Sequence, residues 1–395
     1  MSLREAVVTH ALRTPIARFL GSFVPLSAVE LGTAVVRAVT GRAGLGPGDV
    51  GEVLMGQARQ LGSGPNPARQ VAIRAGLGEG TVATTLNKAC GSSLKAVQLA
   101  AQAVMLGEHD VVVAGGMESM TNIPFLLPDM RLGYRLGHAK VLDGNYQDGF
   151  HCPLSDGPMG MTAENLADRY EIGREEQDAY ALRSFHRWQA AEDAGRFADE
   201  RITVEVPGRK GAVTEVTADE HGRRDLKAAD LAKLPPVFRP DGGTVHAGNS
   251  SGITDGAAAM VITSREEAER RGWPVLATIG AATTAGVAPE IMGIGPVPAV
   301  RALCEREGVA LGDFDLIELN EAFAAQVIAC DRELGLDPDR VNVNGGAIAL
   351  GHPIGATGAR IVVTLLHEMA RRDARLGMAT LCMSGGMGMA VSFRR

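Results

Sequence analysis

The feature of this sequence that most constrains its fold is an order of expected strands and helices that occurs twice. In the first half, strands are expected at 5–9, 52–56, 81–86 and 110–114, and helices at 29–40, 67–75 and 92–106. In the second half, strands are expected at 275–281, 315–319, 341–343, 379–383 and 389–393, and helices at 298–307, 321–334 and 356–370. Alternation of strands and helices predicts an α/β fold with a mostly parallel or mixed sheet.

Two residue matches support a duplication of one α/β unit. Leu45-Gly46-x-x-Asp49-Val50-x-Glu52-Val53 aligns with Leu311-Gly312-x-x-Asp315-Leu316-x-Glu318-Leu319, and Ala114-Gly115-Gly116-Met117 resembles Ser384-Gly385-Gly386-Met387. Two long copies differ from a solenoid, which shows many short repeats. We therefore expect two mixed-sheet halves related by a pseudo-two-fold axis.

The predicted domain boundaries follow from this duplication. Residues 1–120 form the N-terminal half, which about 252–272 complete, and residues 273–395 form the C-terminal half. The proline-rich stretch 121–251 is expected to be an inserted loop domain, with one strong helix over 162–187. Insertions of this kind commonly form binding surfaces.

Composition argues against several classes of protein. The net charge is −7, and no stripe of Lys and Arg with interleaved aromatics occurs, so no nucleic acid is expected as a partner. No apolar run reaches the length of a membrane span, and residues 1–13 have neither a long apolar run nor an Ala-x-Ala site, so we expect neither membrane insertion nor secretion. The odd number of widely spaced cysteines predicts a reducing, cytoplasmic location and no metal site. These cysteines are Cys90, Cys152, Cys304, Cys330 and Cys382.

Cys90 is the leading candidate for a nucleophile. It lies in Asn87-Lys88-Ala89-Cys90-Gly91-Ser92-Ser93, between an expected strand and an expected helix. The positive end of a helix dipole favours a thiolate and lowers the pKa of a cysteine there. The alternative is a buried cysteine beside a tight turn.

Three further polar residues follow expected strands. His352 lies in a glycine-rich loop, Cys382 precedes a glycine turn, and Asn320 ends a strand. Open α/β sheets bind ligands at the carboxyl ends of their strands, so these side chains are expected near Cys90. A lone histidine is also often structural.

These motifs together resemble those of the thiolase family. The similar segments are Asn87–Ser92, Asn320–Phe323, Asn344–Gly355 and Cys382–Gly388, with Met159–Asn165 and Ala247–Ala257 in the middle of the chain. The resemblance covers nearly the whole chain, in the family's order, and implies a thiolase fold.

The resemblance also implies a mechanism. Cys90, activated by His352 as base, forms an acyl-enzyme, and Cys382 carries out the second proton transfer. One oxyanion hole would use His352 and a water held by Asn320. The other would use the backbone N–H groups of Cys90 and Ser384.

The implied substrates are CoA and acyl-CoA, and no cofactor is implied. The residues that would contact CoA or its acyl group are Arg223 (or Arg224), Phe238, Ala247, Ser251, Met159, Ala322 and Phe323. Pro158 stands where thiolases dedicated to acetoacetyl-CoA usually have histidine. This favours a 3-ketoacyl-CoA thiolase of broad or medium chain length, as in β-oxidation, with acetyl-CoA acetyltransferase activity as the alternative.

Rival functions and the state of assembly stay open at this point. The segment Gly248-Asn249-Ser250-Ser251-Gly252 fits the pattern of a serine hydrolase, although the strand before it is weak. A decarboxylating ketoacyl synthase would be expected to have histidine in place of Cys382. A non-catalytic relative that binds CoA or lipid would be expected to lose one of the four polar groups. The resemblance implies a homodimer or homotetramer, with Phe125–Gly144 as a tetramerisation loop.

Overall fold

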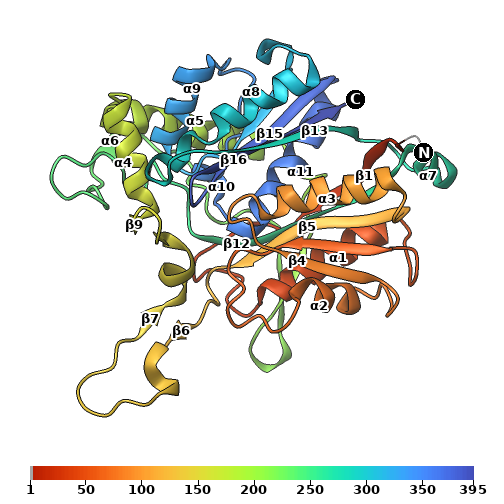
Figure 1. The fold of residues 1–395 in the computed structure, drawn as a ribbon, viewed down its shortest axis with the longest axis horizontal. Coiled ribbons are helices and arrows are strands. Elements are labelled where there is room, and N and C mark those ends of the chain that lie inside the picture. The colour runs from red at the N-terminus through yellow and green to blue at the C-terminus, as the bar shows by residue number, and fades with distance from the viewer. Residues whose placement is uncertain (1–2) are drawn as a thin grey trace.

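A ten-stranded mixed sheet runs through both halves of the protein in the computed structural model, which describes residues 3–395 (Figure 1). Its order is β14-β15-β16-β13-β1-β12-β5-β3-β4, and the short β2 (Ala17–Arg18) pairs with β12. The N-terminal half contributes β1 (Ala6–Arg13), β3 (Glu52–Gly56), β4 (Val82–Leu86), β5 (Val111–Ser119) and β12 (Thr254–Ser264). The C-terminal half contributes β13 (Ala277–Gly286), β14 (Leu316–Leu319), β15 (Leu376–Met383) and β16 (Met387–Arg394).

The pairing of these strands confirms the predicted duplication. In the N-terminal half β3 runs parallel to β4 and β5, β5 is antiparallel to β12, and β12 is antiparallel to β1. In the C-terminal half β14 runs parallel to β15, β15 is antiparallel to β16, and β16 is antiparallel to β13. The strands β1 and β13 pair antiparallel where the halves meet. Each half thus has the same topology, and the innermost strands join across the pseudo-two-fold axis.

The second residue match, which aligned Ala114–Met117 with Ser384–Met387, is wrong by three positions. Val53 of β3 pairs with Val113, and Leu319 of β14 pairs with Thr380, so Val113 and Thr380 hold equivalent places. By that register, Ala114–Met117 of the N-terminal half are equivalent to residues 381–384 of the C-terminal half. The glycines of the first segment lie inside β5, whereas those of the second form the turn between β15 and β16. The likeness between the two Gly-Gly-Met segments is therefore coincidental.

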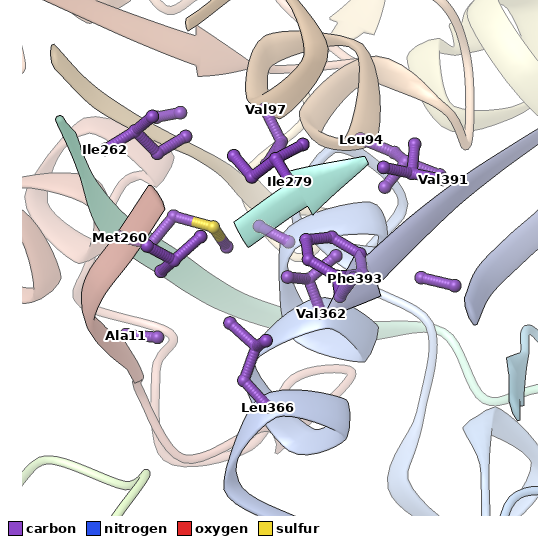
Figure 2. Packing of buried hydrophobic residues seen from close by; sticks show 14 of the residues in the cluster. Ala11, Leu94, Val97, Met260, Ile262, Ile279, Val362, Leu366, Val391 and Phe393 are labelled. Atoms are coloured by element: carbon purple, nitrogen blue, oxygen red, sulfur yellow. The ribbon is translucent and has the colours of Figure 1, made fainter. Parts of the chain in front are cut away.

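Two helices from different halves lie side by side at the centre of the molecule. They are α3 (Ser92–Leu106) and α11 (Ile354–Arg372), and their side chains share one hydrophobic cluster with both halves of the sheet. Figure 2 shows Leu94 and Val97 of α3 near Ile279, with Val362 of α11 beside Phe393. Full burial of each such side chain stabilises the fold by about 1.5–3 kcal/mol. The halves therefore fold around a common core.

The other helices cover the outer faces of the sheet or belong to the segment between the halves. They are α1 (Ala28–Arg42), α2 (Pro67–Arg74), α4 (Met159–Arg169), α5 (Arg174–Asp193), α6 (Ala228–Ala232), α7 (Arg265–Arg271), α8 (Pro296–Glu307), α9 (Ala324–Leu334) and α10 (Ala347–Leu350). No helix within residues 3–395 is both long and apolar enough to cross a membrane.

Two expected elements differ from the structure. The helix expected over 162–187 is in fact two helices, α4 and α5. The chain turns between them, because Glu171 has a φ of +52° and Gly173 caps α5 in an extended conformation. The strand expected at 341–343 is reduced to a single bridge between Ile317 and Val341.

The segment 121–251 is rich in loops, as expected. Its short strands form three hairpins: β6 (Phe125–Leu126) with β7 (Leu142–Asp143), β8 (His151–Cys152) with β9 (Gly157–Pro158), and β10 (Val204–Pro207) with β11 (Val213–Val216). The first hairpin carries a long loop that projects away from the body (Figure 1). The second lies close to the turn between β15 and β16, since Leu154 is near Gly385.

Candidate active site

Cys90 lies in the short turn that joins β4 to α3. Ala89 has a φ of +50°, an uncommon conformation for a residue with a side chain, and it turns the chain sharply before the helix. Ser92 fixes the turn: its Oγ accepts from the N–H of Lys88 at 2.8 Å and donates to the carbonyl of Ala89 at 2.6 Å. The turn places Cys90 immediately before the N-cap of α3, between the strand and the helix as the sequence predicted.

The imidazole of His352 faces the thiol of Cys90. Its Nε2 lies 3.4 Å from the Cys90 Sγ, and its Nδ1 lies 2.6 Å from the Oγ1 of Thr357. Thr357 Oγ1 in turn donates to the carbonyl of Pro353. Because the hydroxyl proton of Thr357 is donated to Pro353, its Oγ1 can only accept a hydrogen bond from the Nδ1–H of His352. This arrangement holds the lone pair of Nε2 toward the thiol.

Burial decides the ionisation of both groups. It raises the pKa of the Cys90 thiol, although the Arg59 guanidinium and the N–H groups of Ser384 and Cys90 act in the opposite direction. The lowered cysteine pKa expected from the helix dipole is therefore wrong, since desolvation outweighs it. Burial, with Arg360 and Arg59 nearby, lowers the pKa of His352 to about 3. The resting pair at neutral pH is a thiol beside a neutral imidazole.

Cys382 and Asn320 lie at the ends of β15 and β14, close to this pair. Cys382 is fully buried, and burial together with the nearby Cys90 raises the pKa of its thiol well above the ordinary value. Asn320 is buried as well, and neither its Nδ2 nor its Oδ1 has a hydrogen-bond partner among residues 3–395. A buried amide of this kind is available to a ligand or a bound water.

A cavity of about 470 Å³ opens onto Cys90, His352 and Ser384. Every residue that the resemblance assigned to CoA lines it: Arg223, Phe238, Ala247, Ser251, Met159, Ala322 and Phe323. The rings of Phe238 and Phe323 meet edge to face at 6.3 Å and build one wall. Arg224, the alternative to Arg223, instead pairs with Asp193 on the surface. Cys382 and Asn320 lie behind the lining.

The structure adds residues to the cavity that the sequence did not single out. Arg59 and Phe150 lie on the side of Cys90, and Arg18, Tyr146 and His221 also line it. Burial lowers the pKa of His221 to about 4, so its ring is neutral at physiological pH. His221 could have been predicted as a cavity residue, because it lies two residues before Arg223, which was expected to contact CoA. Arg59 could not have been predicted in this way, because it follows β3 and lies far from any recognised motif.

The serine of the rival hydrolase motif has no activating base. Ser250 Oγ donates to the backbone carbonyl of His246 at 2.9 Å, not to its ring. The ring of His246 is engaged by Asp178 at 2.7 Å and by the N–H of Gly248 at 3.0 Å. These contacts fix the loop along the cavity and leave no imidazole nitrogen for a serine nucleophile.

Comparison with known proteins agrees with this arrangement. Residues 6–266 match the family model described as thiolase, N-terminal domain, and residues 273–395 match thiolase, C-terminal domain. The chain is 52% identical to an acetyl-CoA acetyltransferase of Pseudomonas aeruginosa and 49% identical to a probable acetyl-CoA acetyltransferase of Escherichia coli, each over 100% of both chains.

Solved structures of thiolases have the same fold as this chain. The acetyl-CoA acetyltransferase of Bacillus anthracis superposes with a TM-score of 0.97 at 42% identity, over 100% of this chain and 99% of the other. Human mitochondrial 3-ketoacyl-CoA thiolase superposes with a TM-score of 0.95 at 40% identity, with the same coverage.

Proposed function

Because the chain belongs to the thiolase family of acyltransferases, we propose that it cleaves acetoacetyl-CoA with CoA and catalyses the reverse Claisen condensation of acetyl-CoA. The observation that carries this proposal is the approach of His352 Nε2 to within 3.4 Å of Cys90 Sγ, at the cavity wall. The names of the similar proteins favour acetoacetyl-CoA over the longer substrates suggested by Pro158. Cleavage of longer 3-ketoacyl-CoA is the second candidate activity.

In the first half of cleavage, His352 Nε2 takes the proton of the Cys90 thiol as the sulfur attacks the 3-keto carbon. The bond between C2 and C3 then breaks, leaving the acyl group on Cys90 and a carbanion on the departing acetyl-CoA. We assign the protonation of this carbanion to Cys382. Its high pKa keeps it protonated until the carbanion forms and makes it a strong base in the reverse direction.

In the second half, the thiol of CoA gives its proton to the Cys382 thiolate left by the first half, and its sulfur attacks the acyl thioester of Cys90. The new acyl-CoA leaves, and Cys90 takes back its proton from His352. The N–H groups of Cys90 and Ser384 converge on the Cys90 sulfur, and we assign them to the oxyanion that develops on the acyl group. His352 and the unpartnered amide of Asn320, through a water, would stabilise the oxyanion of the acetyl-CoA enolate.

The inserted segment supplies the CoA site in this proposal. Arg223 would meet the phosphate or adenine end, and Phe238, Ala247 and Ser251 would line the pantetheine channel. Met159, Ala322 and Phe323 would approach the reacting carbons, and Met159 and Ala322 already pack near Cys382. CoA acts as a substrate, and no step calls for a cofactor.

We further propose a homodimer or homotetramer in the cytoplasm. The five cysteines are all unpaired, which suits a reducing compartment. A role in fatty-acid β-oxidation belongs to the second candidate activity and depends on the acyl chain length that the enzyme accepts.

The experiment that tests the proposed function is CoA-dependent loss of enolate absorbance of acetoacetyl-CoA and of a longer 3-ketoacyl-CoA. Wild type and Cys90→Ala are compared. Cleavage that disappears in Cys90→Ala supports the proposal, and the ratio of the two wild-type rates identifies the preferred chain length. A folded wild-type protein that binds CoA and cleaves neither substrate would reject it.

A further inference from the structure

Arg59 is a buried cation at the acyl side of the cavity. Its side chain is 4% exposed, and it lines the cavity together with Cys90. The neighbouring wall is apolar: Ala58 and Ile354 form a small cluster against which Cys90 and Phe150 pack. An acyl group bound to Cys90 would thus meet an apolar wall with one positive charge in it.

The guanidinium of Arg59 makes no direct ion pair with a carboxylate among residues 3–395. Its Nη1 donates to the backbone carbonyl of Asp148 at 3.0 Å, whereas its buried Nε has no partner. Among residues 3–395 no carboxylate oxygen lies within 4.0 Å of it. A buried charge without a directly paired counter-ion is costly, because it has lost its hydration. A site of this kind is built to receive an anion.

The nearest acid, Glu118, is engaged elsewhere. Its two carboxylate oxygens accept from the N–H groups of Ala58 at 3.1 Å, Arg59 at 3.2 Å and Gly355 at 2.8 Å. Burial raises the pKa of Glu118 to about 7, so a large share of it is neutral at physiological pH. Glu118 therefore gives Arg59 only part of a negative charge.

The surroundings hold the guanidinium in place. The guanidinium lies directly against the backbone of Gly149, since a Cβ added there would fall 1.6 Å from the Cζ of Arg59. The ring of Phe150 lies 5.4 Å from the same Cζ. The cation is packed between the loop and the nucleophile and has little room to turn toward solvent.

From these contacts we propose that the acyl side of the cavity binds 3-ketoacyl groups that carry a carboxylate, with Arg59 as the residue that pairs with it. The inference rests on the proposed thiolase activity and adds a substrate class to it: 3-keto dicarboxylic acids attached to CoA through one end. The reaction steps are those above, and the carboxylate stays bound to Arg59 while the bond between C2 and C3 breaks.

Two six-carbon substrates test this proposal: 3-ketohexanoyl-CoA, which ends in a methyl group, and the corresponding thioester that ends in a carboxylate. The measured quantity is the ratio of their kcat/KM values in CoA-dependent cleavage. Wild type is expected to favour the carboxylate by about tenfold or more, because the methyl analogue leaves the buried cation unpaired. Arg59→Leu should reverse the preference, and Arg59→Lys should retain part of it.

Arg18→Leu is the matched control, since Arg18 also lines the cavity but is paired with Glu220 at its exposed rim. It should leave the ratio unchanged. A wild-type ratio at or below one overturns the inference, even if Arg59→Leu does not fold. Equal losses for both substrates in Arg59→Leu also overturn it, since the cation would then serve Cys90 alone. Failure of wild type on acetoacetyl-CoA itself would instead reject the proposed function.

Discussion

At the scale of single residues, the pairing of Cys90 with His352 is set by desolvation. The half-buried thiol of Cys90, with its raised pKa, does not ionise by itself at neutral pH, and the buried imidazole of His352, with a pKa of about 3, stays neutral. Proton transfer between them becomes favourable only as the sulfur attacks, when the substrate carries away the negative charge. The correct tautomer of His352 is therefore as important as its position.

Thr357→Val tests the role of the hydroxyl that holds this tautomer. The change keeps the shape of the side chain and removes the acceptor for His352 Nδ1–H. We expect kcat for acetoacetyl-CoA cleavage, and the rate of Cys90 alkylation by iodoacetamide, to fall by about 10–100-fold. Thr364→Val, on the same helix but bonded to Glu200, is the control. Equal activity of the two variants would mean that Thr357 does not orient His352.

The pH dependence of stability is predicted from Glu318, which is buried beside Arg360. Burial raises the pKa of Glu318 from 4.5 to about 8, so the folded state binds a proton that the unfolded state releases. This contribution is fully present below pH 4.5 and is lost as the pH rises through 8. The free energy of unfolding should thus fall between pH 7 and 8, with a slope of at most about 1.4 kcal/mol per pH unit for this one proton.

Glu318→Gln should flatten that slope in urea unfolding at pH 7.0, 7.5 and 8.0, even if the variant is less stable overall. Glu267→Gln is the control, because arginine neighbours lower the pKa of Glu267 to about 2 and it does not titrate in this window. An unchanged slope in Glu318→Gln would show that Glu318 is already ionised at pH 7.

At the scale of elements, the active site depends on two helices that start close to one strand. Gly116 of β5 lies against the beginning of both: a Cβ there would fall 2.1 Å from the carbonyl oxygen of Gly355 and 2.6 Å from the Cβ of Ser93. The glycine allows α3 and α11 to bring Cys90 and His352 together. Glycine is required at position 116 because the two helices pack closely against it, not because the backbone has a positive φ there.

Gly116→Ala should therefore destabilise the fold by about 1–3 kcal/mol or more, since backbone cannot move aside as a side chain can. Gly41→Ala is the matched control near the end of α1, where an added Cβ meets nothing within 4 Å. It should stabilise by about 0.5–1 kcal/mol through helix propensity. Urea midpoints of the two variants measure both effects. A neutral Gly116→Ala would mean that α11 can shift without loss.

Much of the fold could be predicted from the sequence, because its elements are long and strongly periodic. The helix over Ser92–Leu106 has the predicted bounds, and the predicted thiolase fold is confirmed by the solved structures. The single helix expected over 162–187 is broken by a turn at Glu171, a residue type that gives no warning of a positive φ. The match between the two Gly-Gly-Met segments failed because short glycine motifs recur in both strands and turns.

The candidate site divides in the same way. The residues predicted from motifs lie around one cavity, which brings Cys90 and His352 together with the residues expected to contact CoA. Arg59 could not be predicted, because it is recognised only by what surrounds it in space. The direction of the pKa shift of Cys90 could not be predicted from the sequence either, since it depends on burial and not on position at a helix end.

At the scale of the whole molecule, the two halves are joined by one core and one sheet, but the segment 125–144 leaves this body. It exposes several large apolar side chains: Phe125 at 66%, Leu132 at 90%, Leu136 at 101% and Val141 at 61%. Apolar side chains gathered on a projecting loop mark an interaction surface more often than a free one. In a symmetric homo-oligomer, such loops from different chains can cover one another.

Replacing Leu132 and Leu136 together by serine tests this assignment. We expect wild type to elute as four chains and the double variant as two, because the loop contacts lose their apolar surface while the rest of the fold keeps its core. Light scattering coupled to gel filtration gives the number of chains, and acetoacetyl-CoA cleavage reports whether the site survives. Val213→Ser, at an exposed apolar position on β11 outside this loop, should leave the assembly unchanged. A wild-type monomer, or a double variant that stays tetrameric, would remove the loop from the interface and leave its exposed leucines to another partner.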